Sequence, residues 1–195
     1  MKVTALLHSA AVAAATSFTL SAYAPGTEVD GAVLNAAASA FYTGISGPAT
    51  YCPIDTGCPE IGGTVVYDGL TAMAVMVPGG QAIYVNPSGQ VKYTVAHSAY
   101  MPLGSYVGGW FNQTVVWDCA PPAQVLNFMA TTTGDGSPAI SGIALCPDVS
   151  EWLSGTGASY QLYAKVPGFA LQDCVDIVGL KVHESPAELG AWQYL

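Results

Sequence analysis

The feature that most constrains the fold is a series of short apolar runs separated by turn sequences, between Met73 and Phe111. Pro78-Gly79-Gly80 is typical of a type II turn, because proline presets φ at the second position and glycine accepts a positive φ at the third. Asn86-Pro87-Ser88-Gly89 indicates a second turn, with Gly89 at the left-handed position. Two successive turns between β-rich runs predict a β-meander.

The clearest strand pattern in the chain follows the second turn. Apolar and polar residues alternate strictly from Gln90 to Val95. This alternation is typical of an antiparallel strand with one buried face. We expect one face to carry Val91, Tyr93 and Val95, and the other Gln90, Lys92 and Thr94.

Further apolar runs at short intervals extend the β pattern along the chain, with no repeat and no linker. Residues Ala36–Ala38 fit either a helix or a strand, a turn is expected at Cys119-Ala-Pro-Pro, and Glu184–Leu195 fits a helical turn or an extended arm. The pattern predicts an all-β, single-domain antiparallel β-sandwich or barrel-like sheet with few or no helices. We expect strands at Phe18–Ala24, Ala32–Asn35, Ala38–Thr43, Val65–Tyr67, Thr71–Val77, Gln81–Val85, Thr114–Trp117, Gln124–Met129, Ile140–Leu145, Tyr160–Val166 and Cys174–Val182.

The N-terminus has the pattern of a secretory signal peptide. Lys2 supplies the positive charge, Val3–Ala15 is an apolar run, and Ala13-Ala14-Ala15 offers a cleavage site. We expect cleavage near Ala15 to Ser17, which gives a signal over residues 1–17 and one secreted domain over residues 18–195. The run is too short to span a bilayer, so no membrane association is expected after cleavage.

Composition argues against nucleic acid as a partner. The chain has 4 Lys+Arg against 13 Asp+Glu, and all four cations are lysines. A net-negative protein without arginine repels phosphates and has no bidentate phosphate clamp.

Five cysteines in an exported chain predict disulfides. Cys52 and Cys58 enclose a short loop stiffened by two prolines, and Cys146 and Cys174 are a natural second pair. The chain-entropy relation assigns roughly 2 kcal/mol to the first and roughly 3–4 kcal/mol to the second. Cys119 is left over, either buried and free or paired between chains.

No pattern in the sequence points to a catalytic site. The G-x-S-x-G pentad of serine hydrolases does not occur, and beyond the signal only His97 and His183 remain. His97 is a general-base candidate, but such a histidine more often holds its loop through hydrogen bonds. We expect no enzymatic activity, no metal site and no cofactor. A glycoside hydrolase would instead need two carboxylates about 5–5.5 Å apart, and the acids available for it are Asp55, Glu60, Asp68, Asp118, Asp135 and Glu151.

Loop aromatics suggest a binding surface for cell-wall polysaccharide, since aromatic rings stack on sugar faces. The candidates are Tyr100, Tyr106, Trp110 and Trp117, which lie close in sequence among glycines. Core packing is the alternative role of these rings. Asn112-Gln113-Thr114 is an N-glycosylation sequon and predicts a surface position for Asn112.

Most of the chain beyond the signal resembles the fungal cell-wall proteins called PhiA-type, also described as IgE-binding proteins. The central block VPGGQAIYVNPSGQVKYTVAHSAYMPLGSYVGG is the longest stretch of this resemblance. Other matching stretches follow the same order, at Phe41–Pro53, Ala144–Asp148, Tyr160–Val166, Asp173–Leu180 and Ala191–Leu195.

The resemblance implies a small non-enzymatic protein secreted by filamentous ascomycetes, located in the cell wall or the medium and linked to spore-bearing structures. Some members of that family react with IgE, and no cofactor belongs to the family pattern. The pattern has counterparts of Cys52, Cys58, Cys146 and Cys174, which independently favours the two pairs. Cys119 departs from it.

Overall fold

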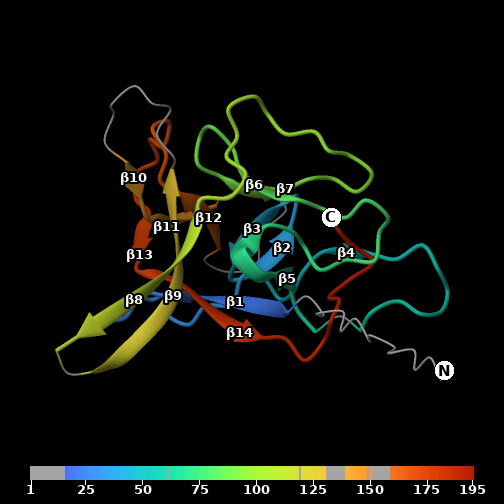
Figure 1. The fold of residues 1–195 in the computed structure, drawn as a ribbon, viewed down its shortest axis with the longest axis horizontal. Helices are drawn as coiled ribbons and strands as arrows, with labels where there is room; N and C mark the ends of the chain where they lie inside the picture. The colour runs from blue at the N-terminus through green and yellow to red at the C-terminus, as the bar shows by residue number, and fades with distance from the viewer. Residues whose placement is uncertain (1–15, 61, 119, 131–138, 149, 151–158) are drawn as a thin grey trace, which may run out of the picture.

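A computed structural model of the chain describes residues 16–60, 62–118, 120–130, 139–148, 150 and 159–195. Antiparallel sheets make up almost all of its regular structure and form a sandwich-like arrangement (Figure 1). The short 3-10 turn η1 (Asp68–Leu70) interrupts the strands. The all-β prediction is therefore confirmed. None of the helices in the described residues is long and apolar enough to cross a membrane.

The first sheet has six strands, and Figure 1 shows β1 and β14 at the lower side of the molecule and β10 at the upper left. β1 and β14 pair along their whole length, and β8 extends the sheet by pairing with β9. The order is β10 (Ile140–Ser141), β9 (Ala120–Ala130), β14 (Gly179–Glu184), β1 (Ser17–Tyr23) and β5 (Val66–Tyr67), with β8 (Trp110–Trp117) beside β9.

The second sheet has seven strands. The hairpin β6–β7 lies at its edge and forms the second half of the meander expected from the turn sequences. The strand expected at Thr71–Val77 is wrong, because these residues form only isolated bridges, among them Ala72 with Ala82. β2 joins the sheet through β3. The order is β13 (Val175–Ile177), β11 (Ile143–Pro147), β12 (Tyr160–Ala164), β3 (Ala40–Thr43), β7 (Val91–Tyr93) and β6 (Ile83–Val85), with β2 (Asn35–Ala37) beside β3.

The C-terminal segment is extended and lies across the end of the sandwich. β15 (Gln193–Tyr194) pairs with β4 (Thr50–Tyr51), which settles the choice between a helical turn and an extended arm. The buried side chain of Gln81 fastens this segment. Its Nε2 donates to the carbonyls of Thr94 and Tyr194, both at 2.9 Å, and its Oε1 accepts from the Tyr194 amide at 2.8 Å.

One apolar core fills the space between the two large sheets. Leu20, Leu180 and Phe128 contribute from the six-stranded sheet, and Phe41 and Tyr93 from the seven-stranded sheet. The rings of Phe41 and Tyr93 meet edge to face with their centroids 5.7 Å apart, a favourable aromatic geometry. The core is therefore shared by strands that are distant in sequence.

Both predicted meander turns are present. The amide of Gly80 donates to the carbonyl of Val77 at 2.9 Å, and Gly79 has φ 89°, as a type II turn requires. The amide of Gly89 donates to Asn86 at 2.9 Å, with φ 96°. A Cβ on Gly89 would lie 2.5 Å from the carbonyl oxygen of Ala164, so glycine also permits the close approach of β12.

The alternation expected up to Val95 ends two residues earlier, because β7 stops at Tyr93. Thr94 is buried rather than outward-facing, and its Oγ1 accepts from the amide of Ala82 at 3.0 Å. Val95 is 62% exposed, so its predicted place on the buried face is wrong. Thr94 is therefore buried here in place of Val95, and its hydroxyl is satisfied by a backbone partner.

The hairpin β2–β3 corrects the prediction of Ala32–Asn35 and Ala38–Thr43 as strands. Its two-residue loop is Ala38-Ser39, and both residues have positive φ, 48° and 56°. Such loops normally contain Asn or Gly, so the sequence carries no turn signal here. Val33 lies outside the strands and forms only an isolated bridge, with Ser21.

Ser17 lies inside β1, at the edge of the predicted signal peptide. Its Oγ donates to the carbonyl of Ala187 at 2.8 Å, and its carbonyl accepts from the amide of Ser185 at 2.9 Å. Cleavage after residue 17 would remove both bonds. We therefore infer a cut on the N-terminal side of Ser17, and the boundary stays a prediction.

Candidate functional site

The structure does not bring together the four predicted aromatics Tyr100, Tyr106, Trp110 and Trp117. Tyr106 and Trp110 are half-buried and stand edge-on against the buried ring of Phe128, with centroid distances of 6.1 and 5.3 Å. Trp117 lies seven residues further along β8, roughly 23 Å away at the usual rise of a strand. Tyr100 is 76% exposed in a loop. Tyr106 and Trp110 therefore pack against the core.

Trp117 instead belongs to a group of side chains on the outer face of the six-stranded sheet. It is 43% exposed, and its Nε1 donates to the Tyr23 hydroxyl at 3.1 Å. The ammonium of Lys181 lies 4.5 Å from the centre of the Tyr23 ring, within cation–π distance. Nearby, Ser21 Oγ and His183 Nε2 are 2.8 Å apart. Two aromatic rings, a cation and an imidazole thus share one surface.

A groove of about 480 Å³ opens beside this group. Tyr23, Lys181 and His183 line one side, and Pro121 to Gln124 line the other. We call it the β9–β14 groove. It is shallow and open, and is bordered by both polar and apolar side chains.

The β9–β14 groove exists because the two strands separate. β9 and β14 are in register only at Leu126 and Leu180. Beyond that point the β8–β9 hairpin leaves the sheet, as Figure 1 shows at lower left. Pro121 and Pro122 lie within β9 there, which corrects the turn expected at Cys119-Ala-Pro-Pro. Proline cannot donate to a ladder, and these two prolines lie opposite a shift in the β8–β9 register, between the pairs Val115–Ala123 and Trp117–Ala120.

Ser21 and His183 form the nearest approach to a nucleophile and a base among the described residues. Ser21 is buried within β1, where it faces Lys181 in register, and His183 is exposed on β14. Catalysis by such a pair requires a third group to orient the imidazole and donors for an oxyanion. For the part of the chain that the structure describes, no hydrogen bond to His183 Nδ1 is found. The contact between Ser21 and His183 joins the side chains of β1 and β14.

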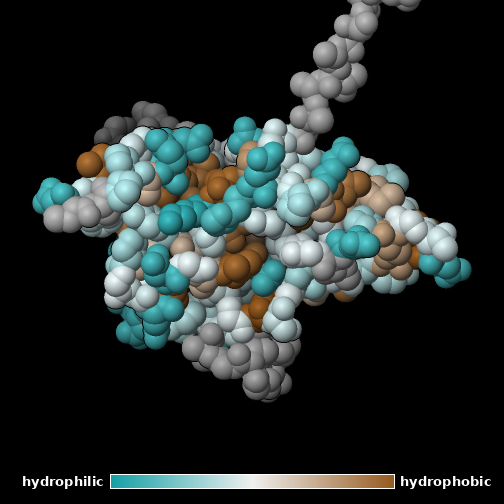
Figure 2. Space-filling view, turned by 90° about the horizontal axis from the view of Figure 1, so that it is seen from below, coloured by the Kyte–Doolittle hydropathy of each residue, from teal (hydrophilic) through white to brown (hydrophobic). Residues whose placement is uncertain are grey.

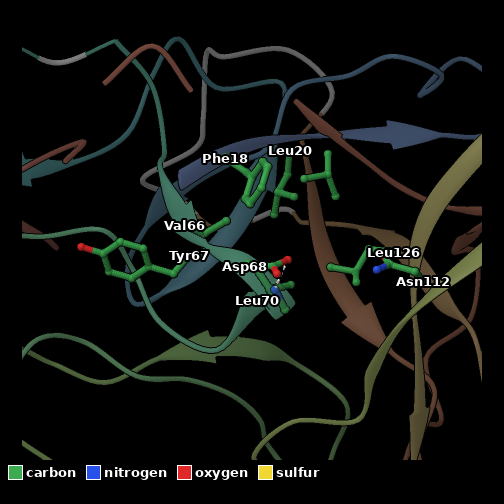
Figure 3. Close-up of a pocket in the computed structure, with 10 residues that line it drawn as sticks. Phe18, Leu20, Val66, Tyr67, Asp68, Leu70, Asn112 and Leu126 are labelled. Atoms are coloured by element: carbon green, nitrogen blue, oxygen red, sulfur yellow. Dashed lines mark hydrogen bonds between the residues drawn. The ribbon is translucent and has the colours of Figure 1, made fainter. Parts of the chain in front are cut away.

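A pocket of about 260 Å³, lined by apolar and polar side chains, lies between η1 and strands of the six-stranded sheet (Figure 3). We call it the η1 pocket. Figure 3 shows Phe18 and Val66 on one side and Leu126 on the other, with η1 between them. Asp68 stands at the pocket, and its Oδ1 accepts from the amide of Gly69 at 2.8 Å.

Asn112 reaches the η1 pocket from β8. Its side chain is exposed, as the sequon predicts, and lies beside Leu126 in Figure 3. In the ladder Asn112 faces Leu126 directly, which explains their proximity. The attachment of a glycan stays a prediction.

Apolar surface is also visible in hollows of the face seen from below (Figure 2).

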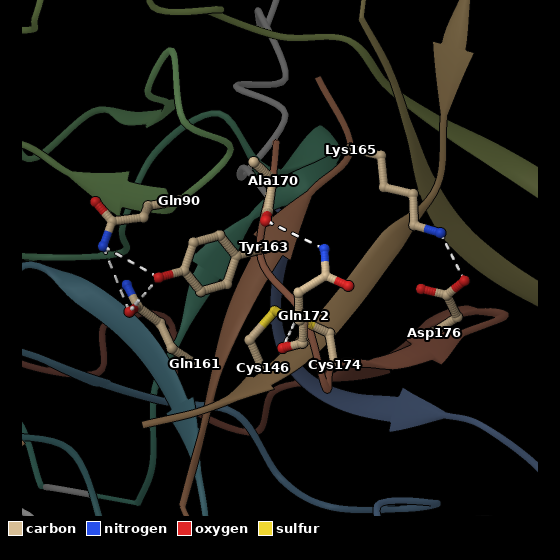
Figure 4. Close-up of a disulfide and its surroundings, with 9 residues drawn as sticks. All are labelled: Gln90, Cys146, Gln161, Tyr163, Lys165, Ala170, Gln172, Cys174 and Asp176. Carbon is tan, nitrogen blue, oxygen red and sulfur yellow. Dashed lines mark hydrogen bonds and ion pairs between the residues drawn. A yellow bond between two sulfur atoms is a disulfide. The ribbon is translucent and has the colours of Figure 1, made fainter. Parts of the chain in front are cut away.

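The structure contains both favoured disulfides. Cys52–Cys58 closes the exposed loop after β4, with a Cα–Cα distance of 6.2 Å. Cys146–Cys174 links β11 to the residue before β13, with a Cα–Cα distance of 4.1 Å. Close to this second bridge, Lys165 Nζ and Asp176 Oδ2 form an ion pair at 2.6 Å (Figure 4).

A polar network lies beside the second bridge on β12, where Gln161 is the ladder partner of Cys146. The Gln90 amide nitrogen donates to the Tyr163 hydroxyl at 3.3 Å and lies 3.5 Å from Gln161 Oε1. Burial raises the pKa of Tyr163, and the hydrogen bond from Gln90 partly opposes this. These groups join β7 to β12 and take no part in either cavity (Figure 4).

The other sequence candidates are scattered. His97 is exposed in the turn after Thr94, with φ 61°, and that turn is closed by a bond from the Ser98 amide to the Val95 carbonyl at 3.0 Å. Within the described ranges, no group of three His, Cys, Asp or Glu side chains is placed to hold a metal ion. The residues outside the described ranges include Cys119, Asp135, Glu151 and Trp152.

Sequence reasoning missed the partners of Trp117 in the β9–β14 groove. Tyr23 and His183 come from opposite ends of the chain and meet only because β1 pairs with β14. The double proline in β9 was the available signal, since it marks a strand edge that pairs with nothing.

The fold and the two disulfides define a β-sandwich protein of the exported, disulfide-bonded type. The chain belongs to a family of fungal secreted proteins. It is 37% identical over 178 residues to an "Uncharacterized secreted protein" of Arthroderma benhamiae, and the match covers 87% of this chain and 82% of the relative. No protein-family model and no solved structure matches the chain.

Proposed function

We propose that this protein is a non-enzymatic component of the cell wall of a filamentous fungus, with a structural or surface-presenting role. The observation that carries the proposal is the family relation to a secreted fungal protein, combined with a β-sandwich that contains two disulfides. Disulfides preserve a small exported fold outside the cell. Three parts of the proposal follow from the resemblance to PhiA-type proteins: the location in the cell wall, the link to spore-bearing structures and the reactivity with IgE.

The test is the location of the protein. The chain is expressed with a C-terminal tag in a filamentous fungus, and the tag is measured in the medium and in washed walls during growth and sporulation. We expect a wall fraction that resists salt washing, against a secreted control of similar size that stays in the medium. Recovery of all the tagged chain from the medium at both stages would contradict the proposal.

A second candidate function is binding of wall polysaccharide in the β9–β14 groove. The observation that favours it is the exposed Trp117 held against Tyr23 beside an open groove of about 480 Å³. Aromatic faces beside hydrogen-bonding groups such as Gln124 and His183 suit the apolar and polar sides of a sugar. This places the candidate surface around one of the four predicted aromatics instead of all four.

Co-sedimentation with chitin and with β-glucan tests this second function. We expect Trp117→Ala and Tyr23→Ala to weaken binding at least fivefold. Tyr100→Ala is the matched control, because Tyr100 is the most exposed of the predicted aromatics and lies outside the β9–β14 groove. Equal binding by all three variants, or no binding by the wild type, would exclude the β9–β14 groove as a sugar site.

A further inference from the structure

The lining, the opening and the volume of the η1 pocket together suggest that it binds a small group. Apolar side chains, with Phe18, Leu20, Val66, Leu70 and Leu126 among them, line it together with the polar side chains of Asp68 and Asn112, and it opens to solvent. Apolar surface left in contact with water is unfavourable, and open apolar pockets in soluble proteins usually mark a binding site. The volume of about 260 Å³ limits the occupant to a small group.

The pocket wall is built at a cost in backbone strain. Leu70 is only 2% exposed, yet its backbone has φ 49°, a conformation that residues other than glycine rarely adopt. Gly69 before it has φ 70°. Strained residues persist where the surroundings over-determine them, and such positions cluster at ligand sites. The turn of η1 thereby places a leucine in the wall and the carboxylate of Asp68 at the opening.

Asn112 stands at the same opening and belongs to the sequon Asn112-Gln113-Thr114. It lies on the same face of the sheet as Leu126, its partner in the ladder. A group attached to the Asn112 amide would therefore begin its path at the pocket. Tethering produces effective concentrations in the millimolar range, so weak contacts would suffice to hold such a group in place.

We propose that Asn112 carries an N-linked glycan and that its first N-acetylglucosamine covers the η1 pocket. The apolar face of the sugar packs over the Phe18 ring and the aliphatic wall, and its hydroxyls face Asp68. Attachment forms a bond from Asn112 Nδ2 to C1 of the sugar, with loss of one proton from Nδ2. The bond from C1 to the diphosphate of a polyprenyl-linked oligosaccharide donor breaks, and the lipid diphosphate leaves.

This proposal rests on the proposed function, which includes export through a eukaryotic secretory route. It deepens that function by naming the chemistry of one site. Glycan attachment is read from intact mass, whereas wall location is read from fractionation. A glycosylated chain found only in the medium would therefore remove the wall role and leave the sugar contact standing.

The experiment compares two enzymatic treatments of the secreted protein, without refolding. An endo-β-N-acetylglucosaminidase leaves one sugar on Asn112, and a peptide-N-glycosidase removes the whole glycan. We expect the one-sugar form to keep the thermal midpoint and the low anilinonaphthalene-sulfonate fluorescence of the untreated protein. Complete removal is expected to lower the midpoint by about 2–4 °C and to raise dye fluorescence at least twofold. No glycan mass on Asn112, or identical readouts for the two treated forms, would overturn the proposal.

Variants separate the sugar contact from other effects of the treatment. Complete removal converts Asn112 to aspartate, so Thr114→Ala serves as a second sugar-free form that keeps the asparagine. Thr114→Ser is its matched control, because it preserves both the sequon and a hydroxyl for the bond from Gln124 Nε2, 2.8 Å in the wild type. Phe18→Leu removes the stacking ring. We expect it to reduce by at least half the difference in midpoint between the one-sugar and sugar-free forms, and an unchanged difference would show that the sugar lies elsewhere.

Discussion

The seven-stranded sheet and the β8–β9 hairpin are built from similar residues but differ in what surrounds them. β3 lies between β12 and β7, and all four of its residues are buried. β8 pairs with β9 alone among the described strands, and most of its residues are exposed or half-buried. Near its end, Val116 is 71% exposed. Apolar sequence therefore signals burial in one region and not in the other.

This difference indicates that one region of the fold provides most of its stability and that another carries the candidate binding surfaces. The seven-stranded sheet contributes Phe41 and Tyr93 to the core and holds the Cys146–Cys174 bridge, whereas β9 contributes Phe128 to the core from the base of the hairpin. The hairpin and the strands beside it border both the β9–β14 groove and the η1 pocket. Changes in the sheet should therefore act on the free energy of unfolding, and changes at the exposed end of the hairpin, near Trp117, on binding.

The largest expected effect is at the centre of the seven-stranded sheet. Phe41→Ala removes a fully buried ring that packs edge to face on Tyr93. We expect a loss of about 3–5 kcal/mol in the free energy of unfolding, because deletion of a buried aromatic leaves a cavity. Urea unfolding of the two proteins measures it. A loss below about 1 kcal/mol would show that the sheet is not the stable region, because substitutions at exposed positions have effects of that size.

Removal of the disulfides is expected to cause the next largest loss in the free energy of unfolding. Cys146→Ser with Cys174→Ser releases a loop with a sequence separation of 28, and Cys52→Ser with Cys58→Ser one of 6. The chain-entropy relation predicts losses of roughly 3–4 and roughly 2 kcal/mol. Thermal unfolding of the two double variants under non-reducing conditions checks this order. The reverse order would show that the exposed loop after β4 contributes more than its length indicates.

Alkaline pH tests the burial of the core tyrosines. Burial raises the pKa of Tyr194 to about 12, although the hydrogen bond from the Val65 amide opposes the rise. Burial likewise raises the pKa of Tyr42 to about 12 and also that of Tyr93. The fold favours the neutral phenols, so their contribution is complete below pH 10 and is lost as pH rises from 10 through 12.

The Tyr194→Phe variant isolates one of these titrations. The variant loses the bonds of the hydroxyl and is less stable at pH 8. Between pH 8 and pH 11, however, its free energy of unfolding should fall by about 1 kcal/mol less than that of the wild type. Urea unfolding at the two pH values measures the difference. Parallel curves would mean that the Tyr194 hydroxyl has its ordinary pKa in the folded protein.

Local chemistry made part of this fold predictable. Pro78-Gly79-Gly80 and Gly89 mark their turns because only certain residues accept those φ angles. The short loop between Cys52 and Cys58 likewise identifies its own bridge. The turn at Ala38-Ser39 was not predictable, because tertiary packing imposes a positive φ on residues that do not prefer it.

The candidate sites depended on contacts that no local pattern contains. Gln81 is buried because the C-terminal segment supplies its partners 113 residues away. Asn112 and Asp68 both line the η1 pocket because β8 and η1, which are distant in sequence, lie against each other. The aromatics near Trp110 looked like one cluster because they are close in sequence, but β8 is extended and separates its two ends.

The smallest expected effect is at the far end of the hairpin, and it is the most direct test of the comparison with the sheet. Trp117→Ala removes an aromatic ring at least as large as the one that Phe41→Ala removes, yet Trp117 is 43% exposed and its indole donates its hydrogen bond to the Tyr23 hydroxyl at the surface. We expect a loss below about 1 kcal/mol in the free energy of unfolding, since little buried area is lost.

Val116→Ala is the control for Trp117→Ala, because Val116 is its more exposed neighbour and should change stability by less than about 0.5 kcal/mol. Amide hydrogen exchange of β8 then separates two outcomes. Faster exchange confined to β8 and β9 in Trp117→Ala means that the hairpin opens independently of the sheets. A loss above about 2 kcal/mol, with faster exchange in β3 as well, would mean that the hairpin unfolds together with the core. In that case stability and recognition are not separated in this molecule, because the side chain beside the β9–β14 groove also supports the sandwich.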